Sequence, residues 1–90
     1  MKISQIKRDK ISEQILSVLY SNFPQPMFTS KIAFEIARDE EFIKKLLFDL
    51  KDKKLIKEIK KNPKGKEYMR RSRWKMDENV YQKYKKYQSA

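Results

Sequence analysis

The chain of 90 residues contains no cysteine and no histidine. Without cysteine it forms no disulfide bond, and without thiolate or imidazole ligands it cannot assemble the usual zinc sites. Glycine is almost as scarce, since Gly65 is the only one, and this excludes a glycine-rich phosphate loop. No acids have a spacing typical of a metal site or an acid–base pair. We therefore expect a protein that is not an enzyme and that binds no metal and no cofactor.

Long apolar runs are missing as well. No run approaches the roughly 18 residues that span a membrane, and residues 1–10 are too polar for a signal peptide. We therefore expect no membrane contact and a cytoplasmic location. The apolar content of 39 % is enough for one modest core, which predicts that residues 1–90 form a single domain.

Positive charge is what the sequence has in excess. Its 23 Lys and Arg residues against 12 Asp and Glu residues leave a formal net charge of +11. Residues 1–53 contain ten basic and eight acidic side chains, whereas residues 54–90 contain thirteen basic and four acidic ones. Because a basic surface attracts polyanions, we expect a polyanion-binding site in the C-terminal part.

Apolar residues at helical spacing predict three helices in the first half of the chain. They are expected over residues 10–21, 30–38 and 40–52. Asp9 and Asp39 are placed as N-caps of the first and the third. The connector NFPQPMFTS contains two prolines and two good N-cap residues, and it leaves room for a very short strand at Met27–Phe28.

Two apolar stripes lie outside the main core pattern. Ile6, Leu16 and Tyr20 fall on the opposite side of the first helix from its main apolar face. That stripe is either additional core beneath a C-terminal element or a surface for a partner subunit. The second stripe lies on a helix expected over residues 78–87, and its tyrosines favour packing or dimer contacts. The candidates for core packing or dimer contact are Ile6, Leu16, Tyr20, Val80, Tyr84 and Tyr87.

A basic β-hairpin is predicted over residues 55–76. The strand-like stretches LIKEIKK and EYMRRSRWKM flank the turn residues NPKG. The alternation in the second strand directs Trp74 and Met76 toward the core and Arg71, Arg73 and Lys75 to the other face. Three of the five arginines of the chain lie in MRRSRWK, with no acid among them.

The order of these elements resembles the winged-helix variant of the helix-turn-helix, including the MarR-like and ArsR-like regulators of archaea and bacteria. The resemblance covers about residues 10–76. It lies in TSKIAFEIARDEEFIKKLLFDLKDKKLIKEI, where the matching residues are Ile32, Ala33, Ile36, Leu46 and Leu50, and in Trp74, which stands where many relatives place a large apolar residue. It implies an α+β, mostly helical fold with three helices, a two-stranded wing and a C-terminal helix. It also implies duplex DNA as partner and a homodimer.

The charge pattern and this resemblance together give the candidate DNA-binding residues. Most are cations of the hairpin, or wing, and the others begin the second helix or lie one turn into the third. They are Lys31, Lys44, Lys45, Lys61, Lys64, Lys66, Arg71, Arg73 and Lys75.

The third helix conflicts with the usual way in which such proteins read DNA. Its N-terminal residues normally contact base edges in the major groove. Here they are Asp39, Glu40 and Glu41, which carry the same sign of charge as the phosphates. We therefore expect the wing to be the main contact, with base readout either limited or dependent on Glu41 as an acceptor from cytosine.

A transcriptional regulator acting on nucleoid DNA is the leading hypothesis, and three others stay open. An architectural chromatin protein would coat DNA with little sequence preference. A protein-interaction module would use the acidic start of the third helix and the second stripe of the first. RNA binding is the last, although the sequence lacks the aromatic strands typical of RNA-recognition motifs.

Overall fold

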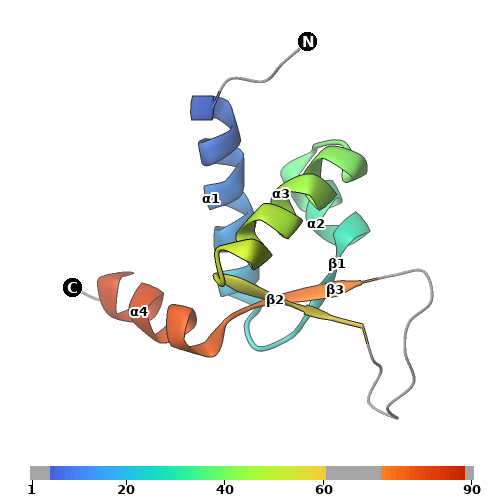
Figure 1. Ribbon diagram of the computed structural model, residues 1–90. Helices are drawn as coiled ribbons and strands as arrows, with labels where there is room; N and C mark the ends of the chain where they lie inside the picture. Colours follow the sequence, from blue (N-terminus) through green and yellow to red (C-terminus); the bar gives the residue numbers. More distant parts are fainter. Residues whose placement is uncertain (1–4, 61–71, 89–90) are drawn as a thin grey trace.

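The computed structural model of the chain describes residues 5–60 and 72–88. In chain order the elements are α1 (Gln5–Asn22), β1 (Met27–Phe28), α2 (Thr29–Ile36), α3 (Glu40–Asp52), β2 (Ile56–Ile59), β3 (Arg73–Met76) and α4 (Glu78–Gln88). Helices α1, α2 and α3 pack together over a small sheet, and α4 follows the sheet at one end (Figure 1).

Helix α1 begins at Gln5 rather than at Lys10, so the prediction of Asp9 as its N-cap is wrong. Asp9 lies within the helix and accepts a hydrogen bond from Gln5 Nε2 at 2.8 Å. Side-chain pairs four residues apart stabilise a helix, and Arg8 forms a 3.1 Å ion pair with Asp49 of α3. These polar contacts extend the helix beyond its apolar stripe.

Helix α2 ends at Ile36 rather than at residue 38, because Ala37 adopts the left-handed conformation with φ 59° and ψ 47°. The amide of Ala37 bonds to the carbonyl of Phe34, and that of Arg38 bonds to the carbonyl of Ala33. Such a closure commonly uses glycine, and a residue with a Cβ atom costs about 1 kcal/mol more there. The tight turn between α2 and α3 therefore begins at Ala37.

The start of α2 also differs from prediction. Its first residue is Thr29, and its N-cap is Phe28, whose side chain makes no capping hydrogen bond. The Thr29 hydroxyl instead accepts a hydrogen bond from the indole Nε1 of Trp74 at 2.8 Å. The side chain expected to cap the helix is used in a contact between α2 and the sheet.

Helix α3 has the bounds that the sequence predicts. The carboxylate of Asp39 accepts a hydrogen bond from the Phe42 amide at 3.0 Å, which confirms this N-cap. Asp77 accepts bonds from the amides of Asn79 and Val80 and so caps α4, which extends to Gln88 instead of ending at residue 87.

The sheet has three antiparallel strands in the order β1-β3-β2. Strands β2 and β3 form the two sides of the predicted hairpin, with Ile56 opposite Met76 and Ile59 opposite Arg73. The short strand Met27–Phe28 pairs with the other edge of β3, so the predicted two-stranded wing shares a third strand at its base. The hairpin segment 61–71 lies outside the described residues.

The core lies between the three helices and the inner face of this sheet. Trp74 and Met76 are fully buried, which confirms the alternation expected for the second wing strand. Phe48 of α3 packs edge-on against the indole at 5.4 Å between ring centroids. The buried core residues are Ile11, Ile15, Leu19, Met27, Ile32, Ala33, Ile43, Leu46, Leu47, Leu50, Ile56, Trp74 and Met76.

The Thr29–Trp74 hydrogen bond is open to a direct test. Thr29→Val keeps the shape of the side chain but leaves the buried indole N–H without its acceptor, so the free energy of unfolding should fall by about 1–3 kcal/mol. Urea unfolding followed by the fluorescence of Trp74, the one tryptophan, measures this. Thr29→Ser retains the hydroxyl and is the control. Equal stability of the valine variant and the parent protein would contradict the role given to this bond.

Candidate nucleic-acid interface

The described residues include five of the nine candidate DNA-binding cations. Lys31 is exposed on α2, and Lys44 and Lys45 are exposed on α3. Arg73 and Lys75 lie on β3 and are partly buried. The remaining four candidates, Lys61, Lys64, Lys66 and Arg71, lie outside the described residues.

The two cations of β3 lie over aromatic rings. The Arg73 guanidinium carbon is 5.9 Å from the ring centroid of Phe28, and Lys75 Nζ is 5.8 Å from that of Phe23. Lys75 also lies 3.9 Å from a carboxylate oxygen of Glu78 at the start of α4, and its side chain is 22 % exposed. Cation–π contacts of this kind restrain long side chains. The sequence pattern placed both cations on the outer face but did not reveal these partners.

A small pocket lies where α2, α3 and the base of the wing meet. It is lined by Phe28, Thr29, Ser30, Glu40 and Ser72. Three of these side chains are hydroxyls, of which Thr29 already accepts a hydrogen bond from Trp74 and Ser72 already donates one to Glu58. Glu40 supplies an acceptor of negative charge. The chemistry suits an uncharged group with hydrogen-bond donors better than a phosphate.

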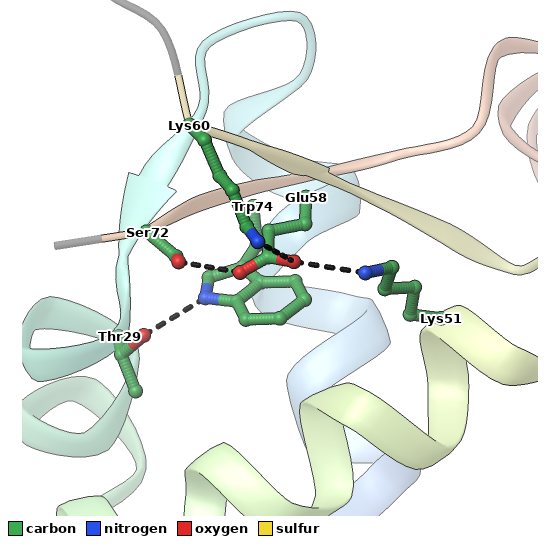
Figure 2. A network of polar contacts seen from close by, with 6 residues as sticks. All are labelled: Thr29, Lys51, Glu58, Lys60, Ser72 and Trp74. Carbon is green, nitrogen blue, oxygen red and sulfur yellow. Dashed lines mark hydrogen bonds and ion pairs between the residues drawn. The ribbon is translucent and has the colours of Figure 1, made fainter. Parts of the chain in front are cut away.

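A buried carboxylate joins α3 to both strands of the wing (Figure 2). The side chain of Glu58 is 4 % exposed and accepts hydrogen bonds from Lys51 Nζ at 2.9 Å and from Ser72 Oγ. Lys60 Nζ lies 3.9 Å from the same carboxylate. Sequence reasoning missed this network. The one available signal is the alternation of LIKEIKK, which places Glu58 on the inward face of the sheet. There it is the cross-strand partner of Trp74.

These contacts shift the titration of the carboxylate. Burial alone would raise the pKa of Glu58, but hydrogen bonds from Ser72 and Lys51 and the charges of Lys51 and Lys60 together hold it below its ordinary value of 4.5. The pKa of Asp77 also lies below its ordinary value, mainly because the Val80 amide bonds to the ionised form. Both acids are therefore stabilised as anions that organise the base of the wing.

The residues of the two additional apolar stripes have different environments. Leu16, Tyr20, Val80 and Tyr84 are partly buried against the core of the same chain. Tyr20 contacts the ring of Tyr84 at a centroid distance of 5.3 Å. By contrast, Ile6 is 70 % exposed and Tyr87 is 88 % exposed. Four of the six candidates thus contribute to packing within one chain.

Among residues 5–60 and 72–88, no group of three or more acidic side chains is arranged to hold a metal ion. In the same part of the chain, every helix is too short or too polar to cross a bilayer.

No protein-family profile and no curated protein sequence matches the chain. Solved structures do match. MepR of S. aureus in complex with DNA has a TM-score of 0.73 at 20 % identity, over 93 % of this chain and 66 % of that one. The Zalpha domain of Carassius auratus PKZ in complex with Z-DNA has a TM-score of 0.62 at 18 % identity, over 79 % of this chain and 98 % of that one.

A third match is Lactococcus lactis ZitR, a zinc-responsive MarR family member, with a TM-score of 0.66 at 19 % identity over 99 % of this chain and 54 % of that one. The chain therefore spans about two thirds of the length of MepR and about half of that of ZitR, but nearly all of the Zalpha domain. At these identities the likeness confirms the winged-helix fold expected from the sequence.

Glu58→Gln tests the buried network through its dependence on pH. The folded-state pKa is lowered, so the carboxylate contributes stability above its unfolded-state pKa, and this contribution is lost as the pH falls through the folded value. We expect the variant to be less stable by about 1–2 kcal/mol near neutral pH. The difference should shrink as the pH is lowered from about 6 to about 3.

Urea unfolding of both proteins over that pH range measures the effect. Glu35→Gln, at an exposed position of α2, removes the same charge outside the network and is the matched control. A stability difference for Glu58→Gln that stays constant with pH would show that its charge contributes nothing.

Proposed function

We propose that this winged-helix chain binds double-stranded DNA as a transcriptional regulator and uses the wing as its main contact. The observation that carries the proposal is that a winged-helix fold and a strong excess of positive charge occur together in the part of the chain that contains the wing. Residues 54–90, which contain the wing, have thirteen basic side chains against four acidic ones. MepR, whose structure is similar to that of this chain, was crystallised in complex with DNA, and this supports the same assignment.

The wing binds by replacing the counterions that condense on the phosphate backbone. Arg73 is suited to this because its planar guanidinium matches two phosphate oxygens and the Phe28 ring restrains it. From the sequence, Lys61, Lys64, Lys66, Arg71 and Lys75 are assigned to the same backbone contact. Lys31, Lys44 and Lys45 add phosphate contacts beside the wing, since all three are exposed on α2 and α3.

Direct base readout has a smaller part in this proposal. Glu40 and Glu41 are exposed at the start of α3, and Asp39 is occupied as its N-cap. Exposed carboxylates oppose the approach of phosphates but accept hydrogen bonds from the amino group of cytosine. Glu41 is the side chain assigned to that contact.

The proposed regulator is a homodimer whose two wings meet half-sites about one helical turn apart. Among the described residues, the large apolar side chains most exposed to a second copy are Ile6, Phe34 and Tyr87. Ile6 and Tyr87 are the two that the sequence pattern had assigned to core packing or dimer contact. Inside a cell, a dimer of this charge would associate with nucleoid DNA.

The wing arginines are tested by the salt dependence of binding. Arg71→Ala with Arg73→Ala should weaken binding to a duplex and flatten the plot of log affinity against log salt by roughly one to two units. Fluorescence anisotropy titrations at several salt concentrations measure the slope. Lys7→Ala with Lys10→Ala removes the same charge from α1 and should leave the slope nearly unchanged. If the arginine variant keeps the slope of the parent protein, the wing is not the contact.

A second candidate function is a protein that recognises the shape or backbone of DNA with little base preference. It is favoured by the acidic start of α3 and by the 98 % coverage of the Zalpha domain, whose structure contains Z-DNA. Such a protein coats or remodels DNA and has no defined target sequence.

Competition between duplexes separates the two functions. A regulator should prefer its genomic site over random duplex by a ratio of ~10³ or more. A shape-reading protein should show almost no such ratio but should prefer an alternating C-G duplex locked in the left-handed form over the same sequence in the B form. If the folded chain binds no duplex at about 0.1 M salt, both functions are wrong and a protein-interaction module is indicated.

A further inference from the structure

Helix α4 carries a second cluster of positively charged side chains, separate from the cations of the wing. Its last two turns, residues 82–88, read QKYKKYQ and contain three lysines and no acid. Lys83, Lys85 and Lys86 are all exposed. The one acid of α4 is Glu78 in its first turn, where it pairs with Lys75.

The inner face of α4 is fixed to its own chain by aromatic contacts. Tyr81 stacks on Phe23 at 3.9 Å and on Tyr20 at 5.1 Å, measured between ring centroids. Val80 and Tyr84 pack against the same core. At about 100° per residue, the helix then directs Lys83, Lys85 and Lys86 away from this packed face. Lys86 points directly outward and Lys83 and Lys85 lie on either side of it. We call the surface formed by these three residues the α4 lysine face.

The start of α4 is held as firmly as its inner face. The Asp77 amide donates to the carbonyl of Leu55 at 3.1 Å, and the Asp77 carboxylate pairs with Lys57 at 3.5 Å. The same carboxylate caps the helix. Contacts with β2 and with the residue before it thus determine where the α4 lysine face lies relative to the sheet.

The two basic regions lie at opposite ends of strand β3. Its first residue, Arg73, follows the hairpin segment, and its last, Met76, leads into α4 through Asp77. In Figure 1 the helix accordingly lies at the end of the sheet away from the point where β2 ends and β3 begins. A duplex held by the wing and a polyanion held by α4 would therefore approach from different ends of the molecule.

The chemistry of the α4 lysine face points to phosphates rather than to a second copy of the chain. In a two-fold symmetric contact the same patch meets itself, which would set three lysines against three others. That arrangement is repulsive, whereas the closely spaced charges of a nucleic-acid backbone are complementary to it. Lysine ammonium groups on flexible stems bind phosphate as point charges without base specificity.

We propose that the α4 lysine face is a second DNA-binding surface, by which one chain holds a second duplex segment while the wing holds the first. The inference rests on the proposed function, because it assumes that the wing binds a duplex. It adds DNA bridging to that function. It also gives the exposed lysines of α4 a role distinct from that of the tyrosines on the same helix.

The experiment measures bridging and simple binding in the same samples. A short duplex immobilised on beads captures the full chain, and retention of a second, fluorescent duplex reports bridging. Lys83→Gln with Lys86→Gln removes two charges from the α4 lysine face. We expect about tenfold less of the second duplex to be retained, through the loss of two phosphate contacts, while affinity for one short duplex changes by less than about threefold.

Two controls make the result specific. Lys7→Gln with Lys10→Gln removes the same charge from α1 and should bridge like the parent protein. Sedimentation velocity checks that the α4 variant keeps the parent association state. Bridging that survives in the α4 variant overturns the proposal, and so does a loss of bridging that comes with a change of association state.

Failure of the inference is distinguishable from failure of the proposed function. If the parent chain binds one duplex but never retains a second, the α4 lysine face is not a binding surface and the wing assignment stands. If the α4 variant loses affinity for a single duplex as strongly as Arg71→Ala with Arg73→Ala does, α4 belongs to the wing site and the proposal is wrong. If the parent chain binds no duplex at all, both fail together.

Discussion

The structure depends most on the burial of one indole ring. Trp74 is fully buried at the centre of the three-stranded sheet, with β1 on one side and β2 on the other. Its ring packs against Phe48 of α3, and its N–H donates to Thr29 at the start of α2. One side chain therefore connects the strands of the wing to α2 and α3, the two helices of the helix-turn-helix. A large ring contributes more buried area than any other side chain could at this position, and its one polar atom is satisfied.

Three acids around this residue have structural roles at helix starts and at the base of the wing. Asp39 caps α3, Asp77 caps α4, and Glu58 joins the end of α3 to both wing strands. Each is held as an anion or bonded to amides within a strongly basic chain. A protein with a net charge of +11 is destabilised by self-repulsion. Placing carboxylates where lysines converge, as Glu58 does with Lys51 and Lys60, offsets part of that repulsion at the base of the wing.

Much of the fold was predictable because its signals are local. The apolar stripe of α3, its N-cap at Asp39 and the alternation that buries Trp74 and Met76 are each encoded by a short stretch of consecutive residues. The starts of α1 and α2 were not predictable, since they depend on other parts of the chain, and the end of α2 was not predictable either. Arg8 of α1 forms an ion pair with Asp49 on α3, and the Thr29 hydroxyl accepts a hydrogen bond from Trp74, 45 residues later in the chain. Ala37 adopts a backbone conformation that residue type alone would not suggest.

The features of the candidate site also divide into those that depend on local sequence and those that depend on long-range contacts. The excess of positive charge, its concentration in residues 54–90 and the residue types proposed to meet phosphates could be read from the amino-acid sequence, because they follow from composition and order alone. The packing of the folded chain was needed to establish which rings restrain Arg73 and Lys75, which carboxylate joins the wing to α3, and which face of α4 is packed against the core. Those outcomes require strands and helices distant in the sequence to meet, and the burial of Trp74 and the aromatic cluster under α4 brings them together.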